Sequence, residues 1–212
     1  MLFRSVSLKK VGDKAHIEEY NALTAKQLKE YRYEGFRVSS ATERGQMPPF
    51  FNSIDLYMNV SGREIQFRAT SGEAGWQGEI KGDTAAGGKI GGGNVNYYLK
   101  KHTGKGIFNN SESEVINFTK SKDFYKEFYA LYKKHFKDAD LSGKPVSLEE
   151  FQKLVKEKQK ESLSYSFSKY INMKFIDIFL SKSPVIRNKI ATDFFRYAAS
   201  NTDQSSFFIK VS

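Results

Sequence analysis

The segment Ser53–Thr70 reads SIDLYMNVSGREIQFRAT, and apolar and polar residues alternate on both sides of its central Ser-Gly pair. This alternation around a turn-forming dipeptide predicts a β-hairpin with a two-residue turn. If the turn closes at Ser61-Gly62, one face of the hairpin is apolar and should point toward a core. That face carries Leu56, Met58, Ile65 and Phe67. The opposite face is polar and carries Asp55, Tyr57, Gln66 and Arg68.

Strand and turn signals surround this hairpin, and helical signals follow it. The segments after the hairpin are predicted as a third strand at Trp76–Lys81, a glycine-rich loop at 82–93 and a short helix or strand at Asn94–His102. After Ser111 glycine becomes rare and apolar residues recur at helical spacing. This pattern predicts helices over 121–137, from Ser147 onward, over Tyr170–Leu180, and from Pro184 to about Ala199. The ending SSFFIKVS predicts a closing strand.

These elements predict an α+β fold in two halves. Residues 1–110 should form a mostly β, glycine-rich half with an N-terminal antiparallel hairpin or sheet, and residues 111–212 a helical half with the final strand. The two halves should share one core. Upstream of the hairpin, Thr24–Gln27 resembles a helix start, which predicts a helix to about Tyr33 that Gly35 ends. A loop is expected from Ser39 to Pro49.

The bulk composition is that of a packed, basic protein. The 212 residues include 18 Phe and 12 Tyr, no Cys, and a formal net charge of +10. The absence of Cys excludes disulfides and thiolate chemistry, and no apolar run is long enough for a membrane helix. The start lacks the features of a signal peptide, so an intracellular, cytoplasmic or virion-associated protein without membrane insertion is expected. The positive charge favours nucleic acid as a partner, ahead of an anionic membrane or an acidic protein.

The stretch WQGEIKGDTAAGGKIGGGNVNYYLKK, residues 76–101, combines glycines, lysines and adjacent tyrosines. Glycine lets successive backbone N–H groups point at a phosphate, and tyrosine rings can stack on bases. The pattern therefore predicts a DNA- or RNA-binding surface made of Arg68, Lys81, Lys89, Gly91, Gly92, Tyr97, Lys100 and Lys101. The alternative is a tight glycine passage between strands. The stretch GDTAAGGKIG lacks the first glycine and the final hydroxyl of a nucleotide-binding P-loop.

Two carboxylates and one lysine resemble the signature of metal-dependent PD-(D/E)XK nucleases. Asp55 would stand for the strand aspartate, and Glu79-Ile80-Lys81 for the Glu-x-Lys on a neighbouring strand. The resemblance implies Mg²⁺ held by Asp55 and Glu79, with Lys81 orienting the attacking water. The alternative is a cross-strand pair between Asp55 and Arg68 on a solvated face.

The segment 138–150 resembles a calcium loop of the EF-hand type. Asp138, Asp140 and Ser142 fall at the first, third and fifth positions, and Gly143 supplies the turn. If Glu149 is the twelfth position, Pro145 occupies the place of the usual apolar residue, and if Val146–Glu150 is the closing segment, the loop is one residue too long. A turn followed by a helix capped by Ser147 explains the same residues without calcium.

The sequence thus leaves three classes of function open. The first is a basic nucleic-acid-binding protein that contacts phosphates through the glycine- and lysine-rich segment. The second is an Mg²⁺-dependent nuclease. The third is a viral or bacteriophage structural or assembly protein, with a protein partner or further copies of itself.

Overall fold

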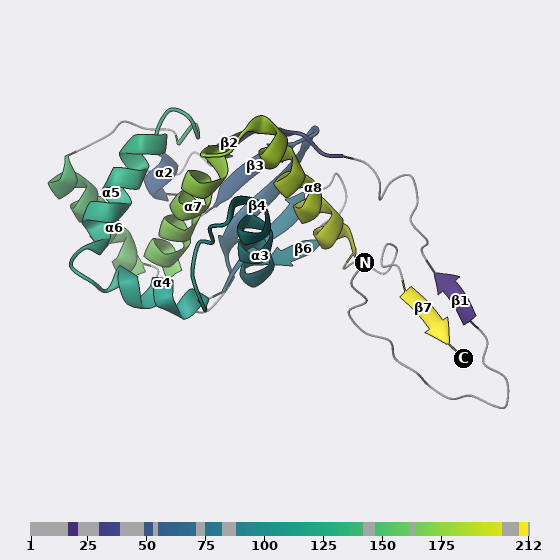
Figure 1. Cartoon of the computed structure of the whole chain (residues 1–212). Coiled ribbons are helices and arrows are strands. Elements are labelled where there is room, and N and C mark those ends of the chain that lie inside the picture. The colour runs from purple at the N-terminus through teal and green to yellow at the C-terminus, as the bar shows by residue number, and fades with distance from the viewer. Residues whose placement is uncertain are drawn as a thin grey trace.

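A five-stranded antiparallel sheet with strand order β2-β3-β4-β5-β6 forms the centre of the fold. The structure is a computed structural model of the chain. It describes residues 17–20, 30–38, 49–52, 55–70, 75–81, 88–141, 147–161, 164–200 and 208–211. The strands of the sheet are β2 (Tyr33–Val38), β3 (Leu56–Val60), β4 (Arg63–Ala69), β5 (Trp76–Lys81) and β6 (Lys89–Gly91). The α+β fold with strands first and helices after them is as the sequence predicts (Figure 1).

The predicted hairpin is present as β3 and β4. Tyr57 pairs with Gln66 and Asn59 with Glu64, which is the predicted register. The turn residues Ser61 and Gly62 have φ values of 48° and 72°. Positive φ at both central positions is typical of the type I′ turn, whose twist matches that of the strands it joins.

Helices cover the apolar face of the sheet. They include α3 (Gly92–Thr103), α7 (Ser164–Leu180) and α8 (Pro184–Ser200). Phe67 of β4 packs against Phe175 of α7 with ring centroids 4.8 Å apart, and its ring stacks on Trp76 of β5 at 5.1 Å. The indole N–H of Trp76 donates to Asn172 Oδ1 at 2.9 Å, which satisfies a buried donor. Buried residues of the sheet and of the helices form one hydrophobic cluster.

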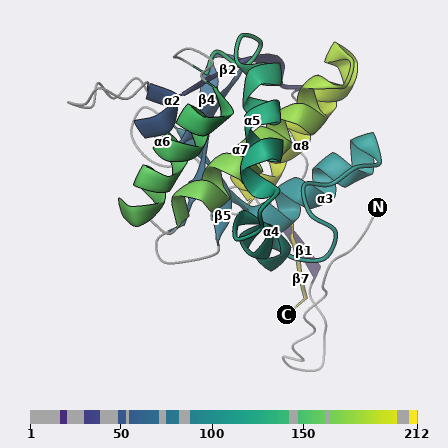
Figure 2. The ribbon, with the colours of Figure 1, turned by 90° about the vertical axis from the view of Figure 1, so that its left-hand side faces the viewer.

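The remaining helices pack beyond α7 or around it. They are α2 (Pro49–Asn52), α4 (Glu112–Thr119), α5 (Phe124–His135) and α6 (Leu148–Glu161). Phe124, Phe128 and Tyr132 of α5 are fully buried, as their helical spacing predicts. Figure 2 shows α3, α5 and α8 on the same side of the sheet. None of the helices in the described ranges is long and apolar enough to span a membrane.

Three local predictions differ from the structure. Glu30–Arg32 are not helical, and β2 begins at Tyr33, so the predicted helix does not reach that residue. Gly35 lies inside β2 at a bulge with φ 150° rather than at a helix end, because pairing with β3 decides the conformation there. The predicted loop 82–93 instead ends in β6 and the first turn of α3; residues 82–87 lie outside the described ranges, as do 21–29 and 39–48.

The last strand, β7 (Phe208–Val211), pairs antiparallel with β1 (Ile17–Tyr20). These two strands form their own sheet and are not part of the five-stranded one. Figure 1 shows the pair apart from the helices that cover the larger sheet.

Candidate nucleic-acid interface

Apart from Gly92, which is buried, the predicted phosphate-binding residues fall on two different surfaces. In the register of the sheet, side chains of paired residues share a face, so the polar face defined by Gln66 continues through Glu79 to Lys89. From the predicted set this face carries Arg68, Lys81, Lys89 and Gly91. The second surface is the exposed side of α3, with Tyr97, Lys100 and Lys101.

The polar face of the sheet is internally paired. The guanidinium of Arg37 on β2 stacks over the ring of Tyr57 at 4.0 Å. It also donates to both carboxylate oxygens of Glu64 on β4, at 2.6 and 2.7 Å. This hydrogen bonding to Glu64 raises the pKa of Arg37 above its ordinary value. The bidentate pair ties β2 to β4 across β3, and much of the charge on this face is therefore used within the sheet.

The carboxylates of the nuclease hypothesis also have partners within the sheet. Asp55 Oδ2 accepts a hydrogen bond from Gln66 at 2.6 Å, and Glu79 Oε2 accepts one from Arg68 at 3.1 Å. Asp55 directly precedes β3 and Glu79 lies in β5; because β4 lies between these two strands, the strands are about 10 Å apart. Lys81 lies two residues after Glu79 on the same face. Within the described ranges, no three His, Asp or Glu side chains converge on one point. The Mg²⁺ site stays a prediction.

Gly92 is buried where α3 begins, and the structure gives a packing reason for the glycine. A Cβ atom built on it would lie 2.1 Å from Glu112 Oε1 and 2.8 Å from the carbonyl oxygen of Trp76. The other Glu112 oxygen accepts the backbone N–H of Trp76 at 3.1 Å. Burial raises the pKa of Glu112, and the hydrogen bond from Trp76 opposes that shift. The Glu112 carboxylate therefore lies beside the N-terminus of α3, which is the position at which a helix stabilises an anion.

A cleft of about 290 Å³ lies where the last turn of α3 meets α8. The burial of Val95 and Leu99 directs the opposite side of α3 to solvent. Tyr97 on that side is 46% exposed. The cleft is lined by Glu30, Lys101, His102, Val185, Asn188, Lys189, Thr192, Asp193 and Arg196.

Asp193 joins the two helices at the centre of this α3–α8 cleft. Its Oδ2 accepts hydrogen bonds from Lys101 Nζ at 2.9 Å and His102 Nε2 at 2.8 Å. Lys189 and Arg196 precede and follow it on α8, at helical spacings that place all three on one side. The sequence prediction includes Lys101 but misses the two α8 cations. Their spacing around Asp193 is visible in the sequence, yet only the packing of α8 on α3 brings them beside Lys101.

Glu30, which lies shortly before β2, lines a third side of the cleft. The backbone N–H of Tyr31 donates to Thr192 Oγ1 at 2.8 Å, and the N–H of Tyr33 donates to Asn188 Oδ1 at 2.9 Å. These bonds fix residues 30–33 along α8. The cleft is therefore bounded by three segments that are far apart in the sequence.

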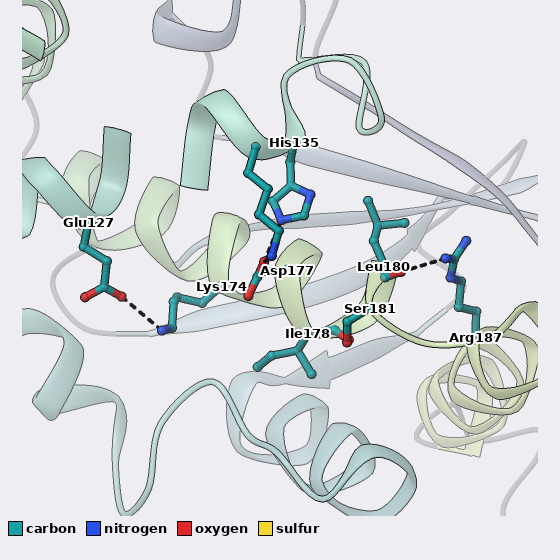
Figure 3. Close-up of polar contacts among 9 residues, drawn as sticks. Glu127, His135, Lys174, Asp177, Ile178, Leu180, Ser181 and Arg187 are labelled. Carbon is teal, nitrogen blue, oxygen red and sulfur yellow. Dashed lines mark hydrogen bonds and ion pairs between the residues drawn. The ribbon is translucent and has the colours of Figure 1, made fainter. Parts of the chain in front are cut away.

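A second polar cluster lies between α5 and α7 (Figure 3). His135 is only 4% exposed, and its Nε2 lies 2.7 Å from Asp177 Oδ1, which also accepts from Lys134 Nζ at 2.6 Å. Burial opposes ionisation of Asp177, but the hydrogen bonds from Lys134 and His135 outweigh it and hold the pKa below its ordinary value. Lys174 of α7 similarly contacts Glu127 of α5 at 3.0 Å. We interpret these contacts as fastening α5 to α7.

The start of α6 matches the predicted cap. The N–H of Glu150 donates to Ser147 Oγ at 3.2 Å, and the N–H of Ser147 donates back to the Glu150 carboxylate at 3.4 Å. This reciprocal pair is a capping box. Residues 142–146 of the calcium-loop resemblance lie outside the described ranges, so calcium binding stays a prediction.

Comparison with known proteins does not assign the chain to a family. It matches no protein-family model, and neither a curated protein nor a solved structure is significantly similar to it. Its function must therefore be argued from its own geometry.

Proposed function

We propose that the protein binds nucleic acid through the α3–α8 cleft and the adjoining exposed side of α3. Binding would use phosphate contacts and stacking on Tyr97 rather than readout of base edges. The observation that carries the proposal is the convergence of three long cationic side chains from two helices, Lys101, Lys189 and Arg196, on one cleft. They outnumber the two carboxylates that line the same cleft, Glu30 and Asp193.

The apolar side chains beside the cleft support the same function. Among the large apolar side chains that the structure describes, Tyr97 and Val185 are the exposed ones, at 46% and 63%. Val185 lines the cleft, and Tyr97 lies one helical turn before Lys101. Flat or apolar groups next to cations are what single-stranded nucleic acid needs, because bases stack while phosphates pair with the cations.

The charge of the whole chain acts in the same direction. A net charge of +10 attracts a polyanion over distances longer than a hydrogen bond, and this attraction weakens as salt screens it. Binding that depends on phosphate neutralisation should therefore lose affinity steeply between about 50 and 200 mM salt.

The test is fluorescence anisotropy with a labelled single strand and a duplex over this range of salt. The decisive variant is the double charge reversal Lys189→Glu with Arg196→Glu, and its matched control is Lys153→Glu with Lys156→Glu on α6. All four side chains are exposed, and both pairs change the net charge equally. The cleft variant should reduce the salt slope by about 0.7 to 0.9 for each phosphate that it no longer neutralises, and the control should reduce it less. Equal reductions in the two variants would show that only the overall charge matters, and no binding at any salt concentration would exclude the function.

A further inference from the structure

We infer that the α3–α8 cleft binds the terminal phosphate of a nucleic-acid strand, a phosphomonoester, in preference to the phosphodiesters inside the strand. This inference rests on the proposed function and names the part of the nucleic acid that the cleft accepts. It follows from the size of the cleft, its third side and its arrangement of charges.

The shape of the cleft favours the end of a strand. Its volume of about 290 Å³ is at the lower limit of pockets that hold small ligands, which is enough for a phosphate with its sugar. The segment held to α8 by Thr192 and Asn188 closes a side that a flat binding surface would leave open. A continuous backbone has to enter and leave its site, whereas a terminal phosphate needs a single opening.

The charges favour a group with more than one negative charge. A phosphomonoester carries about −1.5 to −2 at neutral pH, whereas each internal phosphodiester carries one negative charge. The cleft offers cations on both helices, with Lys101 on α3 and Lys189 and Arg196 on α8, and these three outnumber its two carboxylates, Glu30 and Asp193. The planar guanidinium of Arg196 can donate two parallel hydrogen bonds to phosphate oxygens, so it should contribute most of the preference.

Asp193 gives the cleft a fixed geometry despite its negative charge. One of its oxygens accepts from both Lys101 and His102, so the carboxylate is compensated and these two side chains are held in place before a ligand arrives. Its side chain is 19% exposed, whereas the longer side chains of Lys189 and Arg196 on either side of it are exposed. A pre-positioned cation loses less conformational entropy when it binds.

The experiment compares three single strands of one sequence, which carry a phosphate at the 5′ end, at the 3′ end, or at neither end. One of the phosphorylated strands should bind about threefold to tenfold more tightly than the unphosphorylated one, because of the added charge and hydrogen bonds. Arg196→Gln should remove this advantage, and Lys153→Gln on α6 should keep it. A nucleoside monophosphate, added as a competitor, should displace the phosphorylated strand only at much higher concentration, because it lacks the contacts along α3.

The outcomes separate this inference from the proposed function. Three strands that bind equally, with the expected salt dependence, would overturn the preference for an end and leave nucleic-acid binding intact. An advantage that survives Arg196→Gln would also overturn it, because the end would then be recognised elsewhere. Binding of the nucleoside monophosphate without binding of any strand would assign the cleft to free nucleotides, and both proposals would fail.

Discussion

Alanine substitutions at Gly92 and Gly93 should change the stability of the protein in opposite directions, although these residues are neighbours in the first turn of α3. At Gly93 nothing lies within 4 Å of the position that a Cβ would occupy. Alanine is favoured over glycine in a helix by up to about 1 kcal/mol, so Gly93→Ala should raise the free energy of unfolding by about 0.5 kcal/mol or more.

At Gly92 the same methyl group meets two oxygen atoms. The 2.1 Å approach to Glu112 can be relieved if that side chain turns away, but its hydrogen bond to the N–H of Trp76 then breaks. The 2.8 Å approach to the Trp76 carbonyl remains, because that atom belongs to the backbone of β5. A broken charged hydrogen bond and local overpacking each cost about 1 to 3 kcal/mol. Gly92→Ala should therefore lower the free energy of unfolding by about 1 to 5 kcal/mol after the gain in helix propensity.

Urea unfolding followed by the fluorescence of the single tryptophan measures both variants. Two further variants, Glu112→Ala alone and Glu112→Ala combined with Gly92→Ala, separate the two effects. If Gly92→Ala costs nothing in the Glu112→Ala background, the destabilisation is due to Glu112, and if it costs as much there as in the wild type, the destabilisation is due to the Trp76 carbonyl. The packing explanation for Gly92 is wrong if Gly92→Ala is as stable as Gly93→Ala.

Three further substitutions test the core and its polar contacts. Asn172→Leu removes the acceptor of the Trp76 indole N–H and should cost about 1 to 3 kcal/mol in urea unfolding, whereas an unchanged midpoint would mean that this bond contributes nothing. Gly78→Val places side-chain atoms where even a Cβ meets neighbouring side chains at 2.8 to 3.0 Å, so the melting temperature should fall by several degrees. Asp177 has a lowered pKa in the folded protein, so its contribution to stability is present above its unfolded pKa and is lost as the pH falls through the folded value. Asp177→Asn should therefore be less stable than the wild type near neutral pH, and the difference should shrink in urea titrations below about pH 4; a constant difference would contradict this assignment.

The parts of the fold that the sequence predicts are those in which local chemistry and tertiary pairing agree. Residues Ser61 and Gly62 favour the turn that the alternating strands require, so the register of β3 and β4 follows from 18 residues alone. The strand β2 is not predicted, because the helix-start pattern upstream of it suggests that a helix continues to its first residue. Its strand conformation comes from pairing with β3. The sequence does not predict the short strand β6 for a related reason. Its glycine-rich composition is unfavourable for a strand, and the strand forms because β5 supplies a partner.

The sequence predicts only part of the candidate site, because the site is assembled from distant segments. Tyr97, Lys100 and Lys101 lie in one basic and aromatic run, so the sequence identifies them without knowledge of the fold. The hydrogen bond that builds the cleft joins His102 to Asp193, which are 91 residues apart. Nothing in either segment alone indicates this pairing, and the cations of α8 are therefore assigned to the site only by the packing of α8 on α3.

The cations of α8 also carry more weight than those of α3 in deciding whether the cleft is functional. Lys100 and Lys101 occupy the last turn of α3, where positive charge is stabilised by the helix dipole without any ligand. The last turn of α8 contains no basic residue, and Lys189 lies well inside that helix, so the dipole does not account for it. Helix stability thus explains the basic residues in the last turn of α3. It does not explain the basic residues of α8 that line the cleft. For this reason the charge reversal on α8, rather than one on α3, decides between a generally basic surface and a binding site.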